Sequence, residues 1–367
     1  MSELYVGLMS GTSMDGIDAA LVEFEESSLN ILHTQEFNYS SELRDQLLAA
    51  ITIPLDQPID NIPELNKATG ECFRDAALQL LSEAGVSAEN VTAIGSHGQT
   101  LRHQPDAATP FSLQIADAQL IADGTGVPTI ADFRSADIAA GGQGAPLAPY
   151  FHEWLFRTAS ETRCVLNVGG VANVTVIADG EDTIGFDTGP GNSLMDAWIR
   201  KHRGEKYDKD GSWAATGNID DEVLDQFLAE PYFAFAPPKS TGFEHFNLRW
   251  IEGHDLGATA PSDIQATLCE LSAVSIADAI IDYAPTTSDV LVCGGGAHNP
   301  VLMRQLADRL PNIDVISSSD AGLDPDWVEA AAFAWLAMRH LRNLPGNLPS
   351  VTGASEPVVL GRLFQPH

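Results

Sequence analysis

The sequence predicts an α/β protein made of two domains. The chain of 367 residues is too long for one small hydrophobic core, and its length is typical of two domains. Strand-like apolar runs alternate with helix-like segments along the chain. A pattern of strand, glycine-containing turn and strand also occurs twice, at 4–24 and again at 164–177. The two copies share almost no residue identities, so we interpret them as a repeat of architecture rather than of sequence.

The first half of the chain contains the first strand pair, one long helix and two further strands. The helix is predicted because its apolar residues recur at a helical period, and Gly85 is a suitable stop for it. In chain order the elements are strands 4–10 and 17–24, helix 65–84, strand 91–94 leading into a polar loop at 95–100, and strand 127–131 ending at Asp132-Phe133-Arg134. The glycine-rich stretch 140–146 then marks the expected domain boundary.

The second half repeats the opening pattern and then adds helices with start signals. Ser262 to Gln265 predicts a capping box, while Asn299-Pro300 and Asp324-Pro325 each predict an N-cap with proline at the first helical position. In chain order the elements are strands 164–168, 174–177 and 184–187, helix 193–202, a helix from 262 to near 281, strand 290–293, a helix after 300 and helix 327–341. The glycine turns mostly follow strands, where open α/β sheets bind their ligands.

The formal net charge of −32 restricts the partners of the protein. Binding to nucleic acid or to anionic membranes depends on Lys and Arg that neutralise phosphates, so we expect neither partner. The same charge means that long-range attraction will not bring a phosphate to the protein. Any phosphate site must therefore use local backbone N–H groups, a metal ion and a few well-placed cations.

Cysteine usage and the N-terminus indicate a cytoplasmic protein. The four cysteines are far apart and show no metal-ligand or CxxC spacing, so we expect reduced, buried thiols. The N-terminus lacks the basic start and the long apolar stretch of a signal peptide. No apolar run is expected to approach the length of a membrane span.

The turn Gly11-Thr12-Ser13-Met14-Asp15-Gly16 is a candidate phosphate site. Its spacing matches the first part of a P-loop, but Ile17-Asp18 stands where Lys and Ser or Thr would be required. What remains is a turn that can direct successive backbone N–H groups at phosphate oxygens, while Asp15 or Asp18 holds Mg²⁺ directly or through water. A tight β-hairpin with polar turn residues explains the same composition equally well.

Asp187 is the candidate general base. It ends a predicted strand beside Thr188-Gly189-Pro190-Gly191-Asn192, a turn that opens a helix, so it is placed to face a ligand held by helix N–H groups. A carboxylate there can take a proton from a hydroxyl or a water that attacks phosphorus or carbon. The alternative is an Asp that caps the helix, although a cap needs neither several glycines nor a strand end.

Other segments give weaker signals. Gly294-Gly295-Gly296 lets a flat ring such as a purine approach the backbone, and a plain strand-to-helix loop explains it almost as well. Arg134 is one of few cations, and it either clamps an anion or pairs with the Asp two residues before it. His97 lies in the expected polar loop, and Glu329 could serve only the helix dipole. Pro238-Lys239-Ser240-Thr241-Gly242 matches the tail of a P-loop, but no strand leads into it, so we discount that match.

The order of these motifs resembles that of the sugar kinase and actin-like ATPase superfamily. In that superfamily two related domains clamp ATP in the cleft between them, two hairpins hold the phosphates and a later glycine loop holds the adenosine. Within it, the chain resembles the anhydro-N-acetylmuramic acid kinase family from about Tyr5 to Gly353. The segments that carry this resemblance are GLMSGTSMDGIDAALVEF, IGSHGQTLRHQP, ADFRSADIAAGGQGAPLAP, LNVGGVANVTV, GFDTGPGNSLMDAW, PKSTGFEHFN and LVCGGGAHNPVLM.

The resemblance implies a fold, a reaction and a set of site residues. The fold would be two actin-like (ribonuclease H-like) domains at 1–135 and 136–341, with 342–367 packed back on the first. The enzyme would use ATP and Mg²⁺ to open the 1,6-anhydro ring of anhydro-N-acetylmuramic acid and phosphorylate O6, a step of bacterial cell-wall recycling. It would act as a homodimer.

Carried onto this chain, Asp187 would activate the water that attacks the anomeric carbon, and Arg134 would meet the lactyl carboxylate of the sugar. ATP and its metal would be bound by Gly11, Thr12, Ser13, Met14, Asp15, Gly16, Ile17, Asp18, Gly169, Gly170, Asn173, Gly294, Gly295 and Gly296. The sugar site would be lined by His97, Gly98, Gln99, Thr100, Arg134 and Glu329.

Two other classes of protein share some of these features. An actin-like or chaperone-like ATPase would have the nucleotide clamp without a sugar substrate, although the chain lacks the peptide-binding domain expected of such a chaperone. A glycosidase could use paired carboxylates such as Asp187 and Glu329 without any nucleotide, and the glycine hairpins would then have no purpose.

Overall fold

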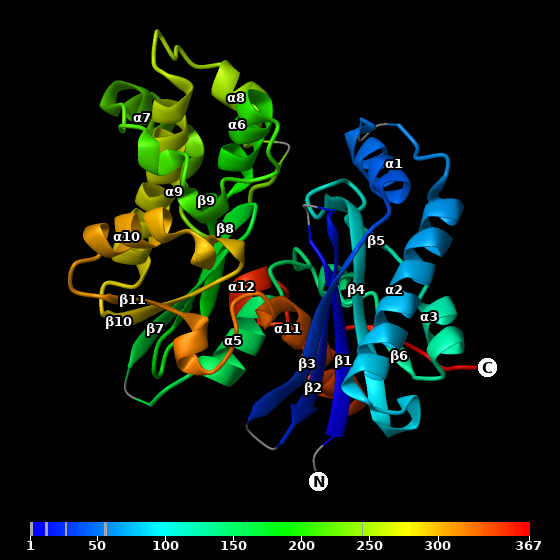
Figure 1. The fold of residues 1–367 in the computed structure, drawn as a ribbon. Coiled ribbons are helices and arrows are strands. Elements are labelled where there is room, and N and C mark those ends of the chain that lie inside the picture. The colour runs from blue at the N-terminus through cyan, green and yellow to red at the C-terminus, as the bar shows by residue number, and fades with distance from the viewer. Residues whose placement is uncertain (1–2, 12–13, 26–27, 55–56, 160, 244) are drawn as a thin grey trace. The chain divides into compact units, whose positions relative to one another are not determined.

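The computed structural model describes residues 3–367 apart from 12–13, 26–27, 55–56, 160 and 244. The chain folds into two compact units (Figure 1). Unit 1 consists of Met1–Leu155 together with Trp327–His367, and unit 2 is Phe156–Asp326. The boundaries between the units follow Leu155 and Asp326, whereas the sequence suggested boundaries after residues 135 and 341.

Buried interactions explain why unit 1 is larger than expected. Asp137 is fully buried and accepts hydrogen bonds from Asn347 Nδ2 (2.6 Å) and Thr352 Oγ1 (2.7 Å). It also accepts one from the amide of Gly144 (2.7 Å), which lies in the glycine-rich stretch. That stretch is therefore bound into unit 1 instead of linking two domains.

Unit 1 is built on a sheet in which the described residues form seven strands, in the order β12-β6-β4-β1-β2-β3 with β5 beside β4. β1 to β3 are antiparallel neighbours, and β4 runs parallel to both β1 and β6. The strands are β1 (Glu3–Ser10), β2 (Gly16–Phe24), β3 (Leu29–Asn38), β4 (Val91–Gln104), β5 (Phe111–Ile115), β6 (Thr129–Ala131) and β12 (Arg362–Phe364).

Unit 2 repeats this arrangement with its own strands. Its sheet has the order β11-β10-β7-β8-β9, with β7 to β9 antiparallel and β10 parallel to both β7 and β11. The strands are β7 (Thr162–Val168), β8 (Val171–Ile177), β9 (Ile184–Pro190), β10 (Thr287–Cys293) and β11 (Asp314–Ser317). Strand for strand, this matches β6-β4-β1-β2-β3 of unit 1, so the prediction of two related α/β domains is confirmed.

Helices cover both faces of the unit 1 sheet. On β1, Val6 and Leu8 belong to the same buried cluster as Leu65 and Phe73 of α2 (Ile62–Ala84). Successive side chains of a strand point to opposite faces, and Gly7, between those two residues, lies against Ala330 of α11 (Val328–Leu341). The other helices of this unit are α1 (Ser41–Thr52), α3 (Ala118–Thr125), α4 (Ser135–Ala139), α5 (Ala148–Phe156) and α12 (Pro349–Thr352), with the short turn η1 (Ala88–Asn90).

Glycine residues allow α11 to approach the sheet closely. A Cβ atom at Gly7 would collide with the backbone of Ala330, and one at Gly95 would collide with the carbonyl of Phe333. Only glycine therefore fits at these two positions while α11 keeps its place. α2 ends as predicted, with Gly85 in the left-handed conformation at φ 67°.

Unit 2 packs around a long central helix, α9 (Pro261–Tyr283). Contrary to the expectation from sequence, α9 is long and apolar enough to cross a membrane by length and composition, but 89% of that window is buried inside the protein. It is therefore a core helix. The other helices of the unit are α6 (Ser193–Arg203), α7 (Asp221–Leu228), α8 (Leu248–Glu252) and α10 (Pro300–Arg309), with the short turns η2 (Lys209–Gly211), η3 (Ala214–Thr216), η4 (Pro231–Ala234), η5 (Gly295–His298) and η6 (Ser318–Ala321).

The predicted helix caps are partly confirmed. The side chain of Asn299 accepts hydrogen bonds from the amides of Val301 and Leu302, as an N-cap does. The capping box at Ser262 does not form, because Pro261 already occupies the first position of α9. Asp324 does not cap α11 either, since its side chain accepts from the amide of Asp326 in a preceding turn.

Candidate active site

The two glycines at the ends of the turn between β1 and β2 have different surroundings. Gly16 is required for packing, because a Cβ there would collide with the carbonyl of Phe37 on β3. At Gly11, by contrast, no described atom lies within 4 Å of the place a Cβ would take. Met14 has a positive φ of 51° and donates from its amide to the Gly11 carbonyl (3.3 Å). Thr12 and Ser13, which the sequence assigns to ATP, lie outside the described residues.

A buried polar network lies under this turn. Tyr39 Oη donates to Ser10 Oγ (3.0 Å), and Gln99 Nε2 donates to the Gly11 carbonyl (3.1 Å). Ser10 Oγ lies 2.6 Å from the Gly16 carbonyl and 2.7 Å from Gln99 Oε1, so its single hydrogen can go to either. Gln99 is 0% exposed. Its contacts are with the candidate phosphate turn, whereas the sequence assigned it to the sugar site.

His97, Arg134 and Glu329 come together in unit 1. Arg134 donates from Nη2 to His97 Nε2 (2.8 Å) and from Nη1 to the Gly144 carbonyl (2.7 Å). Burial, and then the charge of Arg134, lower the pKa of His97 to about 3, so the ring is neutral and carries its hydrogen on Nδ1. Burial raises the pKa of Glu329, and the charge of Arg134 works against that rise.

The sequence could not reveal how Arg134 is held. Asp137 binds the Gly144 amide, and the carbonyl of the same Gly144 accepts from Arg134, so one peptide links the two side chains. Burial lowers the pKa of Arg134 to about 10, while Glu329 and Asp137 oppose this. Arg134 Nε is buried and has no hydrogen-bond partner among the described residues.

Gly98 and Thr100 complete the predicted sugar-site segment. They belong to β4, which the sequence predicted to end at Ile94 but which continues to Gln104. Gly98 has a φ of 73°, and a Cβ there would press on the Ile115 carbonyl of β5 at 2.7 Å. Thr100 Oγ1 accepts from Gln114 Nε2 (3.0 Å). The residues 95–100 therefore form part of a strand and not a polar loop.

In unit 2, Asp187 lies within β9 and not at its end. Its amide donates to the Lys239 carbonyl (3.1 Å), and its Oδ2 accepts from the Thr241 amide (2.9 Å). Its carbonyl accepts from Tyr232 Oη (2.8 Å). The N-cap position of α6 is taken by Asn192. The alternative interpretation, in which Asp187 caps that helix, is therefore wrong.

In the glycine loops of unit 2, some glycines have room for a Cβ atom and others do not. A Cβ at Gly294 would collide with the Asn167 side chain, and one at Gly296 with the Val168 side chain. At Gly295 the nearest described atom is Asn192 Nδ2 at 3.9 Å, and at Gly169 it is the Val171 carbonyl at 3.7 Å.

Gly170 and Asn173 have backbone roles. The Gly170 carbonyl accepts from the amides of Gly191 (2.9 Å) and Ser193 (3.1 Å), which ties the β7–β8 turn to the start of α6. Asn173 lies in β8 opposite Asp187, and not in the turn where the sequence placed it.

The candidate metal ligands flank the hairpin of unit 1. Asp15 Oδ1 lies 3.3 Å from Nη2 of Arg44 on α1, an ion pair that the sequence did not suggest. Ile17 is buried at the start of β2, and Asp18 stands beside Met9 of β1. Among the described residues no group of three or more His, Cys, Asp or Glu side chains could hold a metal. A carboxylate or two together with phosphate oxygens is, however, how Mg²⁺ is usually bound, and this donor set fits that mode.

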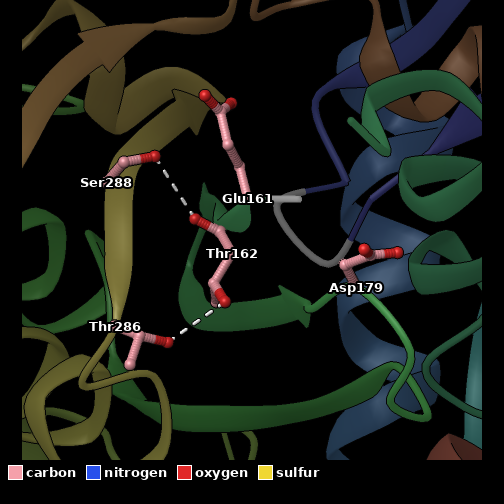
Figure 2. Close-up of a pocket in the computed structure, with 5 residues that line it drawn as sticks. All are labelled: Glu161, Thr162, Asp179, Thr286 and Ser288. Carbon is pink, nitrogen blue, oxygen red and sulfur yellow. Dashed lines mark hydrogen bonds between the residues drawn. The ribbon is translucent and has the colours of Figure 1, made fainter. Parts of the chain in front are cut away.

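One hollow of unit 2 lies at the other end of its sheet from the glycine loops. It has a volume of about 420 Å³ and is lined by Glu161, Thr162, Asp179, Thr286 and Ser288 (Figure 2). Thr162 begins β7, whereas the Gly169 turn follows the last residue of that strand. Thr162 bonds to Thr286 Oγ1 (3.1 Å) and accepts from Ser288 Oγ (3.4 Å). This hollow is thus separate from Asp187 and from the glycine loops.

The chain is similar to known proteins over nearly its whole length. A family model described as anhydro-N-acetylmuramic acid kinase matches residues 3–366. A protein of that name from Xanthomonas campestris pv. campestris (strain 8004) is 50% identical over 367 residues, covering 99% of this chain and 97% of the relative. Another of that name, from Photobacterium profundum, is 47% identical over 370 residues, covering 99% and 98%.

Solved structures of much lower identity also align with most of this chain, each with a TM-score below 0.5. One is the Acidaminococcus fermentans (R)-2-hydroxyglutaryl-CoA dehydratase component A, with a TM-score of 0.48, 10% identity, and coverage of 90% of this chain and 96% of that one. Another is a ROK family glucokinase from Streptomyces griseus in complex with glucose and AMPPNP, with a TM-score of 0.42, 13% identity, and coverage of 90% and 99%.

Proposed function

The chain belongs to the anhydro-N-acetylmuramic acid kinase family, and from that premise we propose how its residues carry out the reaction. The protein is a carbohydrate kinase that uses ATP, opens the 1,6-anhydro ring of its sugar and phosphorylates O6. The products are N-acetylmuramic acid 6-phosphate and ADP. We place the reaction in the cytoplasm, where ATP is available and where the four cysteines would stay reduced.

Asp187 is the general base in this proposal. It takes a proton from water as the water oxygen bonds to C1 of the sugar. The C1–O6 bond breaks and its electron pair stays on O6, which then bonds to the γ-phosphorus while the bond from that phosphorus to ADP breaks. The observation that supports this role is the bond from the Thr241 amide to Oδ2, because it gives the carboxylate a fixed direction.

Arg134 binds the lactyl carboxylate of the sugar. A strongly acidic protein needs a local cation for an anionic substrate, and Arg134 lies half-buried beside the neutral His97, with its Nε buried and without a hydrogen-bond partner among the described residues. The sequence suggested that Gln99 lines the sugar site, and we propose a different role for it. Because it bonds to Gly11 and Ser10, we assign it to shaping the phosphate turn.

ATP is bound through backbone N–H groups of the glycine loops. We assign direct contacts to Gly11, Gly169 and Gly295, at which a Cβ atom would have room among the described residues. Asp15 and Asp18 would hold Mg²⁺, directly or through water, and the ion would neutralise phosphate charge. Arg44 would have to release Asp15 for this to happen.

The variant Asp187→Asn tests the mechanism. It should fold and bind ATP, yet lose turnover by about 10³-fold or more, because an amide cannot accept the proton. ADP release and sugar phosphorylation are followed with and without anhydro-N-acetylmuramic acid. The exposed Asp182→Asn, just before the same strand, is the matched control and should behave as wild type. ADP release without sugar would support an ATPase instead, and ring opening without ATP would support a glycosidase.

A further inference from the structure

Residues 237–242 form a segment that bonds to Asp187. The sequence suggested the tail of a P-loop, but the segment follows η4 and lies beside β9. The segment bonds to both the backbone and the side chain of Asp187. The Lys239 carbonyl accepts from the Asp187 amide, and the Thr241 amide donates to Asp187 Oδ2.

The segment is itself anchored next to Asp187. Lys239 Nζ donates to the carbonyls of Tyr232 (3.4 Å) and Phe233 (3.3 Å), and it lies 4.9 Å from the centroid of the Tyr232 ring. Tyr232 in turn donates from Oη to the carbonyl of Asp187. The Asp187 amide, carbonyl and carboxylate are therefore all bound by η4 and the segment that follows it.

The ammonium group of Lys239 and the carboxylate of Asp187 interact electrostatically. Burial lowers the pKa of Lys239, and the negative charge of Asp187 raises it. This attraction is mutual, so the ammonium group favours the ionised carboxylate. Other titratable groups lie near this segment. The pKa of Tyr232 is raised by burial and then by Asp187, and the Tyr232 ring lies 5.8 Å from that of His245, which is paired with Glu230. Asp278 and Asp282 of α9 line a hollow of about 130 Å³ together with Lys239.

We propose that Thr241 and Lys239 are positioning residues for the reaction: the Thr241 amide fixes the direction of the Asp187 carboxylate, and the Lys239 ammonium keeps that carboxylate ionised. The proposal rests on Asp187 being the general base. Such a base must be ionised before it can take a proton and must point at the water it activates. An N–H bond to a carboxylate is charge-assisted and directional, so it can supply the orientation.

The amide is tested by Thr241→Pro, which removes the N–H, against Thr241→Ala, which keeps it. Thr241→Ala should retain kcat within about twofold. Thr241→Pro should lower kcat by about 10- to 100-fold, the loss expected for a hydrogen bond to a charged group, with KM for ATP unchanged. Equal kcat values for the two variants in folded protein would overturn the role of the amide.

The charge is tested by Lys239→Met and Lys239→Arg. Without the ammonium group the carboxylate holds its proton to higher pH, so the acid limb of the kcat/KM profile of Lys239→Met should move up by about half to one pH unit. Activity should recover as the pH is raised, and Lys239→Arg should restore the wild-type profile. A purely structural role would instead lower activity equally at every pH, and that outcome would overturn the proposal.

Two controls separate this proposal from the function on which it rests. Asp187→Asn should be inactive at every pH, so recovery at high pH identifies an effect on the ionisation of Asp187. If Asp187→Asn were itself active, the general-base assignment would fail whatever the Thr241 and Lys239 variants do. Thermal unfolding of each variant shows whether it is folded, and the Lys239 profiles remain decisive if Thr241→Pro does not fold.

Discussion

Gly294, Gly295 and Gly296 are adjacent, but glycine serves different purposes at these positions. Gly294 has a φ of 75° and faces the Asn167 side chain, and Gly296 faces the Val168 side chain. Gly295 faces open space among the described residues. The first and third glycines are therefore needed for packing, and the second leaves room for a ligand.

Alanine substitutions distinguish these two uses. Gly296→Ala should lower the free energy of unfolding by about 1–3 kcal/mol, because the new methyl group overpacks the end of β7. Gly295→Ala should change that free energy by less than about 0.5 kcal/mol and raise KM for ATP by about tenfold or more. Urea denaturation and initial-rate kinetics measure both quantities. A destabilised Gly295→Ala with an unchanged KM would contradict the assignment.

Some residues of the candidate site could be proposed from the sequence and others could not. Asp187 could be proposed, because a carboxylate next to a glycine-rich turn is a local pattern. Thr241, Asp137 and Tyr39 could not, because each acts through partners far away in the chain. The PKSTG match, which we discounted as a P-loop, lies in the segment that bonds to Asp187.

The helix α11 is the element that brings Glu329 to the sheet of unit 1. It lies against β1 and β4 at Gly7 and Gly95, where no Cβ fits. Its first turn carries Glu329, and Phe333, one turn later, lies 4.7 Å from the His97 ring between centroids. The position of Glu329 near Arg134 thus depends on two glycines that lie against α11.

Gly95→Ala should push α11 away from β4. The expected cost is about 1–3 kcal/mol in the free energy of unfolding, together with a raised KM for the sugar as Glu329 moves. Thr92→Ala, at a half-buried position of the same strand, is the control and should leave KM for the sugar unchanged. If the two variants matched in stability and in KM, α11 would not depend on the glycine contact.

The same contact explains why β4 was harder to predict than its neighbours. Gly95, Gly98 and the polar residues between them have the composition of a loop, yet the glycines are there because other backbone lies against them. β1, β2 and β7 were predicted to within two residues of their ends, since their apolar runs are local signals, whereas β8 begins at Val171, three residues before the predicted start. Strand β9 extends past Asp187 because it is paired with β8 up to Pro190, a long-range contact that no local pattern reveals.

At the scale of the whole molecule, buried histidines make stability depend on pH. The pKa values of His97, His103 and His152 in unit 1 are lowered to about 3, 4 and 3, in each case mainly by burial. An unfolded histidine titrates near 6.5, so between that pH and the lowered values the unfolded chain binds more protons. Their contribution to stability is complete above about pH 6.5 and is lost as the pH falls toward 4.

This effect must be separated from that of the net charge of −32. Protonation of carboxylates relieves repulsion as the pH falls, which acts in the opposite direction. The difference between wild type and His152→Phe isolates the imidazole, because both chains share the same carboxylates. Between pH 6 and 4.5 the free energy of unfolding should fall more steeply for wild type, by up to about 1.4 kcal/mol per pH unit. Equal slopes in urea denaturation would refute this.

The division of unit 1 into two separate stretches of chain determines the order in which the protein can be completed during synthesis. Unit 2 is one continuous stretch, Phe156–Asp326, so it can fold as soon as the ribosome releases it. Unit 1 begins first but must wait for Trp327–His367. Until that stretch emerges, the face of β1 and β4 at Gly7 and Gly95 has no helix to cover it, and Glu329 is absent. The unit that is translated first is thus finished last, and a nascent chain gains Glu329, the acidic residue near Arg134, only near the end of translation.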